Sequence, residues 1–109
     1  MDTPTLADVN IRGVAQRLIE KRLRRNSENL KQLQIELTLL DEQLAALSDD
    51  ANDKEMRSLV SETPLALHEF RDAQKHVDAL QEQRKYLVRA IAEQKQNQDD
   101  LLDKLGNKS

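Results

Sequence analysis

Apolar side chains recur along most of this sequence at alternating spacings of four and three residues, and this repeat is the strongest constraint on the fold. In the first half the positions are Ile19, Leu23, Leu30, Leu33, Leu37, Leu40, Leu44 and Leu47. In the second half they are Ala66, Phe70, Ala73, Val77, Leu80, Leu87, Ile91, Leu101 and Leu105. A 4-3 repeat places one apolar stripe along a helix and is typical of coiled coils. The sequence therefore predicts two long amphipathic helices.

The composition agrees with long helices and argues against a compact globular core. The 109 residues include one Phe, one Tyr and no Trp, while 34% are charged and only two Gly and two Pro are present. With no cysteine we expect neither disulfides nor a thiolate zinc site. No apolar stretch approaches 18 residues, so no membrane insertion is expected. We expect a cytoplasmic protein.

The helix boundaries follow from local signals. We expect a first helix over residues 5–47 and a second over residues 64–105. Thr63 is a good N-cap, and Pro64 suits the first helical position because proline has no backbone N–H to satisfy. The predicted fold is all-α: a long two-helix antiparallel coiled-coil hairpin that forms a single domain over residues 1–109.

The predicted tip covers residues 48–63. Its first residues, SDDAN, are typical of a turn. Asp53 is suited to cap a short helix over residues 53–61. An alternative stays open at this point, in which the hairpin opens at the tip and pairs with a second chain as a domain-swapped dimer.

The polar interruptions of the repeat suggest how the two helices pair. If the numbers of paired residues sum to 110, Asn26 meets Arg84 in a polar layer of the core, and Leu33 meets Val77. Polar positions then face polar ones. Burying a polar group without a partner costs about 1–3 kcal/mol, so we expect this register over one shifted by a heptad.

This register gathers basic residues from both helices into one band. Its members are Lys21, Arg22, Arg24, Arg25, Lys85 and Arg89. The band is interpreted as a docking patch for an acidic protein surface or for phosphates, with a merely solvated helix face as the alternative. Nucleic acid is a less favoured partner, because the net charge is −3 and only one Tyr is available for stacking.

The predicted tip is acidic. It contains Asp49, Asp50, Asp53 and Glu55. A hairpin with an acidic tip resembles, in architecture alone, the transcript-cleavage factors that insert such a tip into the secondary channel of RNA polymerase and hold a magnesium ion with carboxylates. The acidic motif of that family is not matched. The resemblance implies a transcription regulator as an alternative function.

Ile35 and Leu39 form a second apolar stripe. They lie one turn apart, away from the leucine repeat, which suggests that another helix packs there, with incidental exposure of the two side chains as the alternative. This stripe would be covered if two hairpins dimerised into a four-helix bundle, or if a partner subunit supplied a helix.

No catalytic pattern is recognisable in the sequence. His68 and His76 are eight residues apart, without the four-residue spacing of a two-histidine metal site, and are interpreted as surface residues. We expect no catalytic site, no metal and no cofactor. The leading hypothesis is a non-catalytic adaptor or structural subunit that binds another protein through helix packing and the basic band. The alternatives are the polymerase regulator and nucleic-acid binding.

Overall fold

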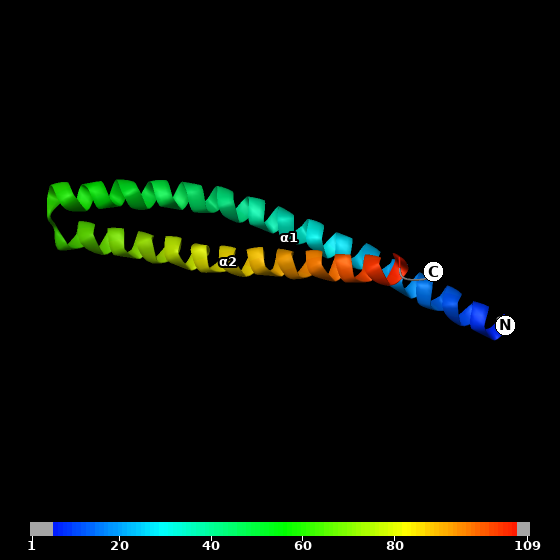
Figure 1. The fold of residues 1–109 in the computed structure, drawn as a ribbon. Helices are drawn as coiled ribbons and strands as arrows, with labels where there is room; N and C mark the ends of the chain where they lie inside the picture. Colours follow the sequence, from blue (N-terminus) through cyan, green and yellow to red (C-terminus); the bar gives the residue numbers. More distant parts are fainter. Residues whose placement is uncertain (1–5, 107–109) are drawn as a thin grey trace. The chain divides into compact units, whose positions relative to one another are not determined.

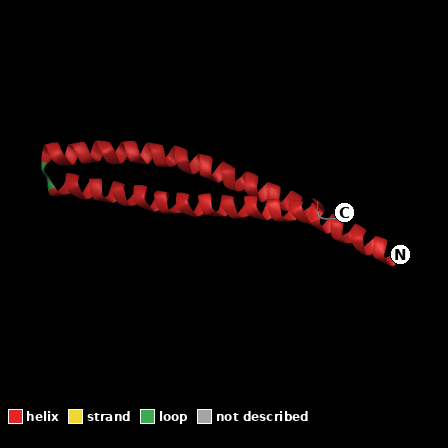
Figure 2. Cartoon of the chain, viewed as in Figure 1, coloured by secondary structure: helices red, strands yellow, loops and turns green. Residues whose placement is uncertain are grey.

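The computed structural model of this chain describes residues 6–106. Within them it forms two helices, α1 (Leu6–Ser61) and α2 (Pro64–Gly106), connected by Glu62 and Thr63 (Figure 1). The described residues contain no strand (Figure 2). The predicted all-α helical hairpin is confirmed.

The described residues form two compact units, one made of residues 33–90 and the other of residues 6–32 together with residues 91–106. Each unit contains one segment of α1 and one of α2. The prediction of one domain over the whole chain stays a prediction.

The unit that contains the connection has one buried cluster made of small residues. Ala51, Ala73 and Val77 are buried together, and the half-buried Leu44 and Leu47 pack against them. Later residues of α1 therefore pack against earlier residues of α2, so the two segments are antiparallel. Alanine at two of these positions lets the helix backbones approach closely, because the side chain ends at Cβ.

The other unit contains a buried polar contact. Asn26 is 7% exposed, and its Nδ2 donates a hydrogen bond of 2.9 Å to the backbone carbonyl of Gln94. Leu23, Leu30 and Leu101, which belong to the 4-3 repeat, are half-buried in the same unit. The repeat therefore faces inward here, as the sequence predicts.

Helix α1 continues through residues 48–61, where we predicted a turn and a short separate helix, and this prediction is wrong. The 4-3 repeat in fact continues beyond Leu47 at Ala51, Lys54 and Ser58, all of which are buried or half-buried. Neither glycine nor proline interrupts residues 48–61. Aspartate and asparagine have low helix propensity, but packing of the inward stripe outweighs that preference.

The connection needs only two residues because each performs a capping role. Glu62 has a φ of 52°, in the left-handed region, and its N–H donates to the carbonyl of Ser58 at 3.1 Å, which ends α1. The Oγ1 of Thr63 accepts a 3.2 Å hydrogen bond from the N–H of Ala66. The predicted start of the second helix at Thr63 and Pro64 is confirmed.

The helices do not pair in the predicted register. Asn26 contacts Gln94 and not Arg84, while Arg84 contacts Asp41. Val77 lies in the cluster of Leu44 and Leu47, and not opposite Leu33. The buried pair Ala51 and Ala73 has numbers that sum to 124, which is two heptads from the predicted 110. The shift follows from α1, which is longer than predicted by about the same two heptads.

Candidate protein-binding surfaces

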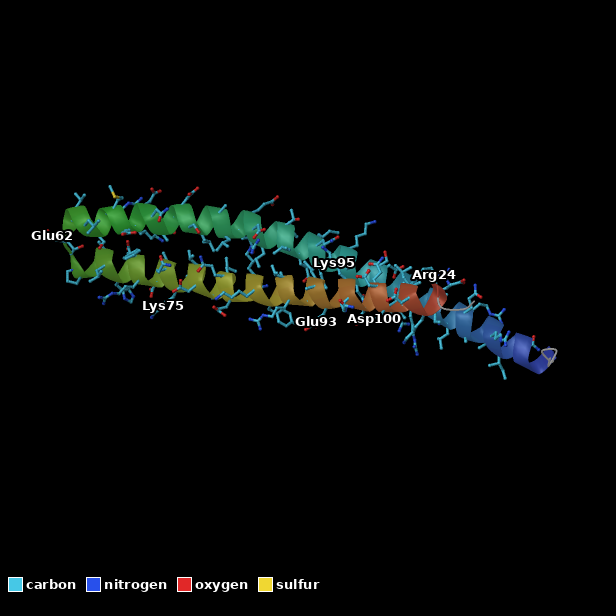
Figure 3. The ribbon with its side chains drawn as sticks, viewed as in Figure 1. Arg24, Glu62, Lys75, Glu93, Lys95 and Asp100 are labelled. Carbon is cyan, nitrogen blue, oxygen red and sulfur yellow. The ribbon has the colours of Figure 1, made fainter. Side chains whose placement is uncertain are left out.

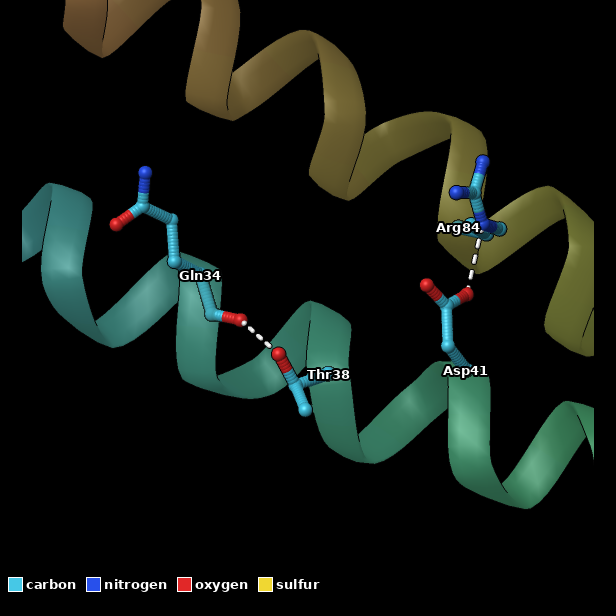
Figure 4. A network of polar contacts seen from close by, with 4 residues as sticks. All are labelled: Gln34, Thr38, Asp41 and Arg84. Atoms are coloured by element: carbon cyan, nitrogen blue, oxygen red, sulfur yellow. Dashed lines mark hydrogen bonds and ion pairs between the residues drawn. The ribbon is translucent and has the colours of Figure 1, made fainter.

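The predicted polar layer of Asn26 and Arg84 is not formed, because each residue has a different partner. Arg84 leaves the core and donates from Nε to Oδ1 of Asp41 at 2.8 Å, with both side chains nearly half exposed (Figure 4). On the same segment of α1, the Thr38 hydroxyl donates to the carbonyl of Gln34 at 3.0 Å. Of these two residues, only Asn26 supplies a buried polar side chain to the core.

The predicted basic band depended on that register and is corrected with it. Lys21, Arg22, Arg24 and Arg25 are exposed on α1 in the unit that contains residues 91–106. Lys85 and Arg89 belong to the other unit, where the Lys85 Nζ lies 3.0 Å from Glu82 Oε1. The contact between Asn26 and Arg84 that was to bring the two groups together is not made.

The α1 cations lie near other residues of α2 than Lys85 and Arg89, and one of these is an aspartate. Arg22 and Arg25 line an open hollow of about 310 Å³ between the two helix segments of this unit, and Asp100 and Lys104 line it from α2. Figure 3 labels Arg24 and Asp100 on these segments. Asparagines 26, 29 and 97 complete the polar part of the wall. The hollow therefore has mixed charge rather than forming a uniform cationic band.

The acidic residues predicted for the tip lie along the side of α1. Asp49, Asp50, Asp53 and Glu55 are exposed, and the Asp50 Oδ2 forms an ion pair of 2.9 Å with the Lys54 Nζ. The connection itself, Glu62 and Thr63, carries a single carboxylate. In the part of the chain that the structure describes, no three His, Cys, Asp or Glu residues are placed to hold a metal ion.

The second apolar stripe is exposed. Ile35 is 47% exposed and Leu39 is 55% exposed, in positions half-way round α1 from the inward repeat. The pair was predicted from the sequence, but its spacing was not followed into residues 48–63. Counting in steps of three and four from it reaches Met56 and Val60, which are also exposed. The signal was present in the sequence and was missed because residues 48–63 were interpreted as a tip.

Apolar residues also gather next to the connection, where sequence reasoning predicted acidic ones. Met56, Leu59, Val60 and Leu65 are each more than 60% exposed. Met56 and Val60 line an open hollow of about 410 Å³ with Ala66 of α2. Exposed apolar clusters of this kind mark surfaces that contact other molecules.

The two histidines are exposed, as the sequence analysis expects. His68 Nε2 lies 3.2 Å from the carboxylate of Asp72, one turn away on α2. Among residues 6–106, no helix has a stretch both long and apolar enough to span a membrane. Comparisons with protein families, with characterised proteins and with solved structures found no match to this chain.

Proposed function

We propose that this chain is a non-catalytic binding module, an adaptor or structural subunit, whose outer α1 surface packs against a helix of a protein partner. The observation that carries the proposal is the exposure of Ile35 and Leu39, one turn apart and away from the inward repeat. Helix α1 has two apolar faces, and the inward one is buried within the hairpin. The outer one is exposed and favours contact with a further helix.

The spacing of this outer stripe suits a helical partner. Anchors at four-residue spacing are those by which one amphipathic helix packs against another. Burying a Leu or Ile side chain fully is worth about 1.5–3 kcal/mol, and these two side chains have about half of that still to gain. The absence of cysteine supports a cytoplasmic setting, which is part of the same proposal.

The test compares two variants that carry the same added charge. Ile35→Glu with Leu39→Glu places two carboxylates on the outer stripe, while Ala79→Glu with Ala92→Glu places two at exposed positions of α2. Each tagged protein, helical by circular dichroism, is cross-linked in an extract of its native cells, and the captured proteins are identified by mass spectrometry. We expect a protein captured by the wild type and by the α2 variant to be lost with the α1 variant. Equal capture by all three would contradict the proposal.

A further inference from the structure

We propose that the outer stripe of α1 binds a partner helix that carries apolar side chains near both ends and a row of basic side chains between them. This inference rests on the proposed function and adds the chemistry of the partner. The binding surface lies within residues 33–61, which belong to one uninterrupted helix and to one compact unit. Continued through this segment in steps of four and three, the stripe comprises Ile35, Leu39, Glu42, Ala46, Asp49, Asp53, Met56 and Val60.

The two ends of this stripe are apolar. Ile35 and Leu39 form one end, Met56 and Val60 form the other, and all four side chains are exposed. At about 1.5 Å per residue, the two pairs lie about 30 Å apart along the helix. Met56 and Val60 also line the hollow of about 410 Å³ beside the connection, so an apolar side chain of a partner can enter at this end. A helix that covers both pairs therefore needs an apolar anchor near each of its ends.

The middle of the stripe is acidic. Glu42, Asp49 and Asp53 are exposed there, and within the described residues none of them takes part in an ion pair. Ala46, the remaining residue of the middle, is exposed and small. A partner with an apolar middle would remove these carboxylates from water without a counter-charge, which costs free energy. Basic side chains opposite them supply that counter-charge, so they are what the middle of the stripe selects.

The other charged residues of this segment do not neutralise the acidic middle. Lys54 is half-buried and pairs with Asp50 at 2.9 Å. Arg57, the one other cation among residues 33–61, lines the hollow at the apolar end of the stripe. The remaining charged residues of the segment are all carboxylates: Glu36, Asp41 and Glu55. The segment therefore attracts cationic partners.

A second copy of the same segment lacks this chemistry. The antiparallel register that covers both apolar pairs brings Glu42 against Asp53, and the unshifted parallel register brings each carboxylate against its own counterpart. Shifts by one or two heptads, in either orientation, place an apolar residue against a carboxylate. A shift by three heptads leaves an apolar pair uncovered. Because like charges that meet are unfavourable, the stripe selects a basic helix over a copy of itself.

The first experiment uses two synthetic helical peptides of the same composition and net charge. In one, four lysines lie between two leucine pairs on a single face, at the spacing of the stripe. In the other, the lysines lie on the opposite face and alanines take their places. We expect the full-length chain to bind the first peptide about tenfold more tightly by calorimetry, with an affinity that falls as salt rises. Equal affinities for the two peptides, or an affinity that salt does not change, would overturn the inference.

The second experiment reverses the charge of the stripe. The variant with Glu42→Lys, Asp49→Lys and Asp53→Lys should lose the lysine peptide and bind a peptide in which glutamates replace the four lysines. Circular dichroism checks that the variant is helical. A neutral variant with Glu42→Gln, Asp49→Asn and Asp53→Asn, which introduces no like charges, should bind the lysine peptide more weakly than the wild type does. Unchanged binding by either folded variant would contradict a role for these carboxylates.

A matched control separates the stripe from the overall charge. Glu93→Lys with Asp99→Lys and Asp103→Lys gives the same net charge at exposed positions of α2, and should bind the lysine peptide like the wild type. Loss of binding in this control would overturn the inference, as would self-association of the wild type that Ile35→Glu with Leu39→Glu abolishes. If that double variant no longer captures a cellular protein that the triple lysine variant of the stripe still captures, the proposed function stands and this inference fails.

Discussion

Arg84 occupies an inward position of the α2 repeat, yet its guanidinium leaves the core and contacts the carboxylate of Asp41 on α1 at 2.8 Å. At a register sum of 124 the residue opposite Arg84 is Leu40, which is buried. An arginine facing a leucine cannot find a polar partner inside the core. It therefore extends along the helix surface, where one carboxylate and water satisfy it.

Replacing Arg84 with leucine should stabilise the hairpin. The leucine would pack against Leu40, and we expect the free energy of unfolding to rise by about 1 kcal/mol in urea titrations, from apolar burial alone. Lys85→Leu, one residue away at an exposed position, is the matched control and should show no gain. Asp41→Asn should cost less than about 1 kcal/mol, because the ion pair is half exposed. A large loss with Arg84→Leu would contradict the observed register.

The register can be tested by cross-linking within one chain. Ala51→Cys with Ala73→Cys should form an intramolecular disulfide under mild oxidation, because the two alanines belong to one buried cluster between the helices. Leu33→Cys with Val77→Cys, the pair expected from matching polar positions, should not. Gel mobility with and without reductant, at high dilution to suppress intermolecular bonds, distinguishes the two. Cross-linking of the second pair alone would show that the hairpin uses the register that sums to 110.

Truncating the Asn26 side chain should lower the free energy of unfolding more than truncating the exposed Asn29. Asn26→Ala removes a hydrogen bond to the Gln94 carbonyl and leaves a small cavity, so we expect a loss of about 1–2 kcal/mol in the free energy of unfolding. Asn29→Ala removes the same amide from the wall of the same hollow at an exposed position, and should stay within about 0.5 kcal/mol of the wild type. Equal losses for the two would show that the Asn26 contact contributes nothing specific.

Glycine at position 62 should stabilise the connection. Glu62 has a left-handed backbone conformation that residues with a Cβ adopt only at a cost, and glycine is the usual residue at this place after a helix. We expect Glu62→Gly to raise the free energy of unfolding by about 0.5–1 kcal/mol. Glu62→Ala, which keeps the Cβ, should give no such gain. Thermal unfolding followed by circular dichroism measures both, and equal midpoints for the two variants would argue against the positive φ.

The sequence predicted where the second helix begins better than where the first one ends. Thr63 and Pro64 are a strong start signal, and the structure uses both. Helix α1 ends at Ser61, and the next residue, Glu62, adopts the conformation usually given to glycine, so no residue type marks this end. The turn-forming residues after Leu47 pointed to an earlier end. Their preference is local, and it is outweighed where Ala51 is buried against α2.

Which residues of one helix are exposed could be predicted from the sequence. Which residues of the other helix lie beside them could not. The exposure of Ile35 and Leu39 followed from the repeat, because residues outside an inward stripe face away from it. The prediction of the basic band depended on a particular alignment of the two helices, which is not the observed one. Residues that are distant in sequence come together only through that alignment, and it was chosen by matching polar positions.

The sequence by itself determined the number of long helices and which face of each points inward. A 4-3 repeat places its apolar residues along one face of a helix, and each helix must bury that face. The tertiary structure decided the register. Every shift by a heptad keeps the stripes in contact, so the stripes alone cannot choose among these registers. The choice is made by a two-residue connection, which brings Ser61 next to Pro64 and thereby places Arg84 beside Asp41 and Asn26 beside Gln94.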